Sequence, residues 1–411
     1  MTDKSIWDKP IPVPERLIEY VDQGIRDKLP PGTQIQGIKK SGASYWAQTA
    51  KIVATDEEGN PTPFFIKVHQ FEHGKDMVSA EYFSMSLLHS IAPELVAEPL
   101  AWGTYTEEPD TYFFLCRFHE FSDELPDQED FIKVVADLHK RGTSKTGEFG
   151  FPITTYGGRN PQTFPMCKSW EECFSKGLEK LFDTEEQTHG PDEEMRSLRE
   201  GFMTKVIPRL LRPLETEGRT LIPTLVHGDL WDGNVAVDAA TNRPMIFDAS
   251  PLYAHDEYEL APWALIRHNI GRSYIDEYLN YRRLDFPAEP KEDFEDRLLV
   301  YALRFDLLSS SLYPGNLHFR GLVLDTMRNL VGKYPLGYEG YLLERGLVPN
   351  ANIATSNALA TGENGEVVAE GFQATSTQER TTPDDGTSGG GGVRIQAEKV
   401  DISCVSMGID E

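Results

Sequence analysis

The chain has 411 residues, 39% of them hydrophobic and 10% aromatic, which is the composition of a globular protein long enough for two or three domains. Its formal net charge is −26; residues 351–411 hold 10 acidic and 3 basic residues, which leaves −19 on residues 1–350. The acidity therefore belongs to the main part of the chain, and it disfavours nucleic acids and anionic membranes as partners.

Cysteine usage and the amino-terminal residues point to a reducing compartment. The four cysteines occur at no metal-like spacing, and so small a number does not suggest a disulfide framework. The first residues form no apolar leader, and no run approaches the roughly 18 apolar residues of a membrane span. We predict a cytoplasmic protein.

The first thirty residues combine a proline-punctuated arm with a helical pattern. Leu17, Ile18, Val21 and Ile25 recur at helical spacing between Pro14 and Leu29. This periodicity predicts one amphipathic helix that packs on the part of the chain that follows.

Residues 31–120 are predicted to be rich in strands. Turn clusters separate short apolar runs, and one longer segment, Met77–Ser90, has apolar residues at helical spacing. The predicted strands are Ile35–Lys40, Trp46–Ala54, Pro63–His69, Pro99–Gly103 and Thr111–Phe118.

The turn between the first two predicted strands, Ser41 to Ser44, consists of small residues. Such a loop allows backbone N–H groups to approach phosphate oxygens, so Gly42 and Ser44 are candidate nucleotide-binding residues. An ordinary hairpin turn would have the same composition.

Lys67 lies in an otherwise apolar predicted strand, where a buried charge is costly without a partner. The next predicted helix presents Glu81 on its apolar face. We predict a Lys67–Glu81 ion pair that places the ammonium group on the α- and β-phosphates of ATP. The alternative is a lysine at a strand edge and a glutamate on the helix surface, both in solvent.

From Gln128 onward the pattern becomes helical. A helix is predicted to end at His139-Lys140-Arg141 with Gly142 as its C-cap, and His139 is expected to be a helix-end residue. Residues 168–216 predict two charged amphipathic helices that separate near Gly190, and residues 262–346 are helix-rich. Within that last region Arg304 is a candidate for an ion pair in the protein interior.

The chemistry-bearing stretch runs from Leu225 to Ser250. His227-Gly228-Asp229 is followed five residues later by Asn234 and fourteen residues after that by Asp248, which is the spacing of a kinase catalytic loop and its metal-binding aspartate. Asp229 is placed to orient and deprotonate an attacking hydroxyl, while Asn234 and Asp248 are oxygen ligands suited to Mg²⁺. A turn and a strand end would explain single residues, but not three at this spacing.

The amino-acid sequence of this stretch also resembles that of a known family. HGDLWDGN, the later IFD and the segment Tyr253–Ala261 resemble the fructosamine kinase (ketosamine 3-kinase) family. Trp231 is the discriminating residue, because HGD with a later Asn and Asp also occurs in aminoglycoside and choline kinases. The resemblance covers roughly residues 20–345. One departure is Asp248-Ala249-Ser250, where the family usually has Asp-Pro-Ala, so we expect a differently shaped turn.

The resemblance implies an α+β, protein-kinase-like fold with a small β-rich N-lobe, a larger helical C-lobe and ATP between them. We predict an amino-terminal arm and helix (1–30), the nucleotide-binding N-lobe (31–120), the catalytic C-lobe (121–350) and a disordered acidic tail (351–411). The implied activity is Mg²⁺- and ATP-dependent phosphorylation of the 3-hydroxyl of ketosamines. These are fructosamine or ribulosamine adducts on small amines or protein lysines, and the implied role is protein deglycation and repair.

Glu259 is expected to cap or pair structurally. Trp231 is a candidate to stack on the substrate sugar, or it packs beneath the catalytic loop.

Two alternative functions stay open. One is a kinase of the same fold acting on an aminoglycoside- or choline-like alcohol, and the other is a non-catalytic pseudokinase that binds partners. The intact set of lysine, glutamate, asparagine and two aspartates named above argues against the pseudokinase.

Overall fold

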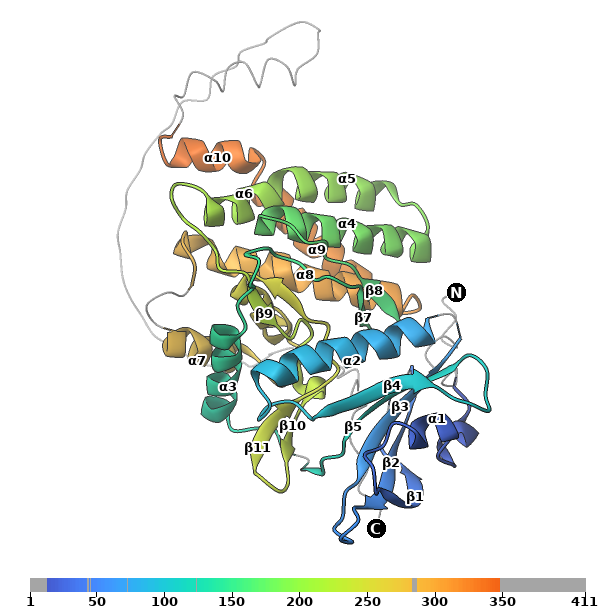
Figure 1. Ribbon diagram of the computed structural model, residues 1–411. Helices are drawn as coiled ribbons and strands as arrows, with labels where there is room; N and C mark the ends of the chain where they lie inside the picture. The colour runs from blue at the N-terminus through green and yellow to red at the C-terminus, as the bar shows by residue number, and fades with distance from the viewer. Residues whose placement is uncertain are drawn as a thin grey trace, which may run out of the picture. The chain divides into compact units, whose positions relative to one another are not determined.

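The computed structural model describes residues 13–347, except residues 43, 45, 72, 123 and 283–286 (Figure 1). The predicted tail and the first part of the amino-terminal arm lie outside the described residues. Among the helices that are described, none is both long and apolar enough to cross a membrane.

An antiparallel five-stranded sheet of order β1-β2-β3-β5-β4 forms the first part of the structure (Figure 1). Its strands agree with the predicted ones to within two residues at each end. They form because β-branched and aromatic residues alternate between the two faces of the sheet. The strands are β1 (Gln34–Lys40), β2 (Gln48–Thr55), β3 (Phe64–Gln70), β4 (Pro99–Thr104) and β5 (Thr111–Arg117).

Helix α2 (Gly74–Ile91) packs on this sheet against β3, β4 and β5 (Figure 1). Val78, Met85 and Leu88 are its buried apolar contacts. This i, i+7, i+10 spacing fixes the rotation of the helix, and it turns Glu81 toward β3.

The predicted amino-terminal helix is wrong as a continuous element. Residues Glu15–Ile18 form one 3₁₀ turn, and helix α1 (Gln23–Arg26) is a separate short turn. Asp22 interrupts them: its carboxylate accepts hydrogen bonds from the backbone N–H of Gly24 and of Thr106, each at 2.7 Å. A side chain that caps a new helix and also holds the β4–β5 loop ends the preceding turn. The apolar residues of this segment are nevertheless buried against the sheet, as predicted.

The second part of the structure is helical. Helix α8 is buried on almost every side and packs against α4 and α9 (Figure 1). The predicted separation near Gly190 is confirmed, because α4 ends at His189 and α5 begins at Glu193. The helices are α3 (Gln128–Arg141), α4 (Trp170–His189), α5 (Glu193–Gly201), α6 (Ile207–Leu211), α7 (Arg272–Arg282), α8 (Phe294–Leu312), α9 (Leu317–Lys333) and α10 (Gly337–Glu344).

Three small antiparallel ladders hold the loops of the predicted catalytic stretch. β9 (Thr224–Val226) pairs with β12 (Leu252–Ala254), and β10 (Val235–Asp238) pairs with β11 (Arg243–Ile246) and with β6 (Phe121–Ser122). The loop that carries Asp229 therefore connects β9 to β10, and Asp248 follows β11. In a further hairpin, β7 (Thr155–Gly157) pairs with β8 (Asn160–Gln162).

Candidate active site

A cleft lies between the five-stranded sheet and the β10–β11 ladder. Its walls come from the β1–β2 loop, β3, α2, the segment after β5 and the end of β11. The structure thus brings predicted residues from four separate segments to one place. Those lining the cleft are Gly42, Ser44, Lys67, Glu81 and Asp248.

Lys67 lies at the centre of this cleft. Its Nζ is 2.8 Å from Oε1 of Glu81, the predicted partner, and it also forms an ion pair with Asp248, which was not predicted. Burial alone would lower the pKa of Lys67, but the carboxylates of Asp248 and Glu81 outweigh burial and raise it above its ordinary value. The lysine is therefore a permanent cation.

The predicted phosphate loop lines the opening of the same cleft. Gly42 has a φ of +79°, and a Cβ there would lie 3.2 Å from Oγ1 of Thr49, so this position favours glycine. Ser44 accepts a hydrogen bond from the backbone N–H of Trp46 at 3.2 Å, which uses its hydroxyl inside the loop. Ala43 and Tyr45 are outside the described residues.

Three stacked rings form another part of the cleft wall. The ring centroid of Phe121 lies 6.4 Å from that of His119 and 5.6 Å from that of Phe247. Nδ1 of His119 lies 2.6 Å from Oδ2 of Asp238, which fixes the imidazole to β10. Flat aromatic surfaces of this kind suit a planar base.

A buried carboxylate binds the backbone at the start of the predicted catalytic loop, the segment that contains Asp229. Glu259 accepts hydrogen bonds from the backbone N–H groups of His227 (2.5 Å) and Gly228 (3.0 Å). His139 lies 3.3 Å from the same carboxylate and 2.7 Å from the hydroxyl of Tyr278. His139 does end α3, as predicted, but it is buried and supports Glu259, a role that its position in the sequence did not reveal.

Asp229 and Asn234 meet at the end of this loop. Nδ2 of Asn234 donates to the backbone carbonyl of Asp229 at 2.8 Å and lies 3.3 Å from its Oδ2. Burial raises the pKa of Asp229, and the charges of Arg304, His227 and His268 oppose that shift. A carboxylate with a raised pKa is a better proton acceptor than one in water.

Trp231 is half-buried and covers part of the loop. Its ring lies 5.0 Å from the ring of His268, and a Cβ on Gly233 would lie 2.2 Å from the indole. Asp232 accepts hydrogen bonds from the backbone N–H and the side-chain amide of Asn269, both at 2.9 Å. Residues 268–269 thus form a second support of the catalytic loop, which no sequence signal had indicated.

The chain is similar to known proteins of one family. The family model described as fructosamine kinase matches residues 19–329. The chain is 37% identical over 289 residues to the mouse protein named ketosamine-3-kinase, which covers 69% of this chain and 81% of the relative. It is 25% identical over 279 residues to the rice chloroplastic protein-ribulosamine 3-kinase, covering 66% and 72%.

The chain belongs to the fructosamine kinase family. Among solved structures, one from Thermobifida fusca with the provisional name fructosamine-3-kinase matches with a TM-score of 0.57 at 20% identity, over 73% of this chain and 95% of the other. A Haemophilus somnus structure with the same provisional name has a TM-score of 0.55 at 17% identity, over 72% and 92%. The fold is therefore protein-kinase-like, as predicted.

The departure from the family pattern after Asp248 has a structural consequence. Oγ of Ser250 lies 2.8 Å from Oγ1 of Thr155 on β7, and the backbone N–H of Ser250 donates to the carbonyl of His227 at 3.0 Å. Asp248 itself has a φ of +57°, in the left-handed region. The serine therefore links the turn after Asp248 to the β7–β8 hairpin through a hydrogen bond that alanine cannot make.

Arg304 forms no ion pair with any of the described residues, contrary to the prediction. It is 1% exposed, its Nη2 donates to Oε1 of Gln162 on β8, and its guanidinium lies 4.5 Å from the ring centroid of Phe305. Among the described residues, Nε and Nη1 have no hydrogen-bond partner. The charge still acts on the site, because it favours the ionised form of Asp229.

Within the described part of the chain, no cluster of three or more His, Cys, Asp or Glu side chains could bind a metal by itself. The predicted pair of Asn234 and Asp248 fits a different arrangement. Since Nδ2 of Asn234 points at Asp229, its oxygen points away from Asp229. One amide oxygen and one carboxylate suit Mg²⁺ that arrives with phosphate oxygens as further ligands.

Proposed function

We propose that this protein transfers the γ-phosphoryl group of ATP to the 3-hydroxyl of a ketosamine. The observation that carries the proposal is that the Lys67–Glu81 pair and Asp248 line one cleft, while Asp229 and Asn234 contact each other on the loop before β10. The two groups are joined by the backbone N–H of Phe247, next to Asp248, which donates to the carbonyl of Asn234 at 3.1 Å. Family membership supports the acceptor, because the mouse and rice relatives are named for ketosamine and ribulosamine.

Each predicted site residue has a role in this proposal. Asp229 orients the sugar hydroxyl and takes its proton as the bond to phosphorus forms. Lys67, held by Glu81, binds the α- and β-phosphates, and the loop that contains Gly42 and Ser44 covers them. Trp231 offers a partly exposed ring face to the sugar, at the edge of the catalytic loop.

Asn234 and Asp248 would hold Mg²⁺ against the phosphates. The ion would neutralise charge on the transferring group, as a divalent metal does in other phosphoryl transfers. Asp248 would exchange its ion pair with Lys67 for the metal when nucleotide enters.

The wider role follows from the resemblance noted in the sequence. A 3-phosphorylated ketosamine becomes unstable and releases its amine, so the proposed role is deglycation and repair. We also propose the division into an N-lobe (31–120) and a C-lobe (121–350), and a cytoplasmic location. The free, buried thiols of Cys116, Cys167 and Cys173 support a reducing compartment.

The test is ADP release from Mg·ATP with ribulosyl-lysine, fructosyl-lysine, choline and kanamycin as acceptors. Turnover on a ketosamine that is lost in Asp229→Asn, but kept in the exposed control Asp325→Asn, supports the proposal. Turnover on choline or kanamycin alone would assign another alcohol as acceptor. ATP binding without any turnover would favour the pseudokinase. Omission of Mg²⁺ should abolish activity, and added Mg²⁺ should restore it.

A further inference from the structure

Trp46 lies at the end of the predicted phosphate loop, shortly before β2, and contacts the helical part of the structure. Its backbone N–H donates to Oγ of Ser44, one of the residues that line the cleft of Lys67. Its ring centroid lies 6.5 Å from that of Tyr313, the residue that follows α8. Trp46 therefore joins the loop to the part of the structure that also carries the catalytic loop.

The turn of the β7–β8 hairpin meets the same indole ring. The guanidinium carbon of Arg159 lies 5.3 Å from the centre of the Trp46 ring, in the arrangement of a cation–π contact. Gly158 has a φ of +56°, and a Cβ there would lie 3.0 Å from Nε1 of Trp46. The hairpin turn thus packs closely on the indole, and a side chain at position 158 would crowd it.

The chain just before this hairpin also packs against helix α2. The ring centroids of Phe83 on α2 and of Phe151 lie 5.8 Å apart, with the rings edge to face. Helix α2 carries Glu81, the partner of Lys67 in the cleft. Residues 151–162 therefore contact two of the elements that line the cleft, the phosphate loop through Trp46 and α2 through Phe83.

The same hairpin is connected to the catalytic loop at two points. Oγ1 of Thr155 on β7 lies 2.8 Å from Oγ of Ser250, and the backbone N–H of Ser250 donates to the start of the catalytic loop. Gln162 on β8 accepts a hydrogen bond from Arg304, whose charge favours the ionised form of Asp229. A displacement of the hairpin would thus act on the loop that carries the proposed base.

We propose that Trp46 is a positioning residue that couples the binding of ATP to the placement of Asp229, with the β7–β8 hairpin as the element between them. The inference rests on the proposed function, in which the phosphate loop covers the phosphates. Phosphates that bind the loop hold the indole in one place, the indole fixes the hairpin turn, and the hairpin fixes the catalytic loop. Because such coupling is reciprocal, a bound acceptor should strengthen the binding of nucleotide by the same factor.

The first test needs no acceptor. Amide hydrogen exchange of residues 155–162 is measured with and without the non-hydrolysable analogue AMP-PNP and Mg²⁺. We expect the nucleotide to slow exchange in the wild-type hairpin by about five-fold or more, and to have no effect there in Trp46→Ala at equal saturation. Trp46→Phe keeps a ring and should restore part of the effect. Equal slowing in the wild type and in Trp46→Ala would overturn the inference.

The second test measures the coupling itself. The dissociation constant of AMP-PNP is determined with and without saturating ribulosyl-lysine, which cannot react with this analogue. It should fall about five-fold or more with the acceptor in the wild type and stay constant in Trp46→Ala. The same fall in both proteins would contradict the inference. Failure of the wild type to bind AMP-PNP, or to turn over any ketosamine with ATP, would instead refute the proposed function.

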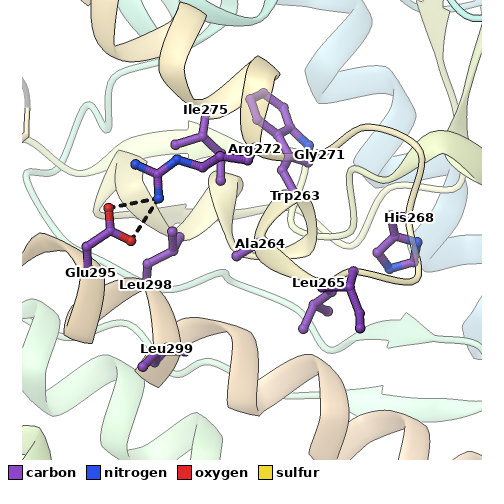
Figure 2. Close-up of a pocket in the computed structure, with 11 residues that line it drawn as sticks. Trp263, Ala264, Leu265, His268, Gly271, Arg272, Ile275, Glu295, Leu298 and Leu299 are labelled. Carbon is purple, nitrogen blue, oxygen red and sulfur yellow. Dashed lines mark hydrogen bonds and ion pairs between the residues drawn. The ribbon is translucent and has the colours of Figure 1, made fainter. Parts of the chain in front are cut away.

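Leu299→Ala is the matched control for both tests. Leu299 lies on α8, the helix that ends beside the hairpin turn, but it lines a separate, mainly apolar cavity of about 290 Å³ between residues 262–271, α7 and α8 (Figure 2). Its replacement removes an apolar side chain from α8 and leaves the contacts of Trp46 in place, so both readouts should match the wild type. Loss of the coupling in Leu299→Ala as well would overturn the role assigned to Trp46.

Discussion

The carboxylate of Glu259 accepts a hydrogen bond from the backbone N–H of His227, 32 residues earlier in the chain. It accepts a second from Gly228, and His139 completes its surroundings. Burial would raise the pKa of Glu259, but these donors outweigh burial and hold the pKa below its ordinary value. The carboxylate is thus ionised inside the protein and fixes the start of the catalytic loop.

We expect Glu259→Gln to lower the free energy of unfolding by about 2–4 kcal/mol, because an amide cannot accept both backbone hydrogen bonds with a full charge. Chemical denaturation measures this loss. Glu200→Gln, on the exposed surface, should change stability by less than about 0.5 kcal/mol. A Glu259→Gln protein as stable as the wild type would mean that the loop is held by other contacts.

Asp229 should determine the acidic limb of the pH profile. The base must be ionised to accept a proton, and burial raises its pKa, so activity is present above that raised pKa and is lost as pH falls through it. We expect the midpoint of the acidic limb of kcat/KM to lie above the ordinary aspartate pKa of about 3.9. Replacement by Asn should reduce kcat about 10²–10⁴-fold. A profile that stays flat down to pH 4 would argue against Asp229 as the base.

Substitution of Arg304 is a second test of the acidic limb of the pH profile. Its charge favours ionised Asp229, so Arg304→Met should move the limb to higher pH by up to roughly one unit, whereas Arg304→Lys should not. Met also removes the donor to the buried Oε1 of Gln162, so we expect a loss of stability of about 1–2 kcal/mol. Identical limbs in the Met and Lys variants would contradict the electrostatic role.

We expect Glu81, through its ion pair with Lys67, to orient the ammonium group for the nucleotide. Glu81→Gln leaves Lys67 paired with Asp248 alone, so the ammonium should shift toward the metal side of the cleft. We expect KM for ATP to rise about ten-fold, which corresponds to about 1.4 kcal/mol, with KM for the acceptor unchanged. Initial-rate measurements with each substrate varied in turn separate the two. An equal rise in both constants would point to general damage to the fold.

The Ser250–Thr155 contact can be tested as a pair. Ser250→Ala should cost about 1–2 kcal/mol of stability, because the buried hydroxyl of Thr155 loses its 2.8 Å partner. Thr155→Val should cost a similar amount, and the double variant less than the sum of the two. Strict additivity would show that the two hydroxyls do not interact in solution.

The sequence predicted those features of the site that depend on spacing along the chain. Asp229 and Asn234 lie on one loop, and Asp248 follows β11. Lys67 lies on β3 and Glu81 on the helix that follows it. The spacing of these residues along the chain was therefore enough to group them. The partners contributed by distant segments were not predictable. His139, His268 and Thr155 meet the catalytic stretch only through tertiary packing.

Two predictions failed because side chains compete for partners in ways that periodicity does not show. The amino-terminal pattern is helical, but Asp22 caps a new helix there and binds the β4–β5 loop. Arg304 carries a positive charge on a buried helix, so a carboxylate partner was predicted. Its guanidinium instead donates to the amide oxygen of Gln162 on the β7–β8 hairpin.

Lys67 bridges Glu81 on α2 and Asp248 after β11, so the nucleotide-free cleft contains its own counter-ion for the proposed metal ligand. On the proposed function, Asp248 would bind Mg²⁺ when Mg·ATP enters, and the ammonium of Lys67 would then be free to pair with phosphate oxygens. Because one cation would replace another beside Asp248, and the displaced ammonium would pair with the phosphates, few ions would need to be taken up from or released to the solvent. Nucleotide affinity should accordingly depend only weakly on ionic strength, despite the strongly acidic surface of the protein.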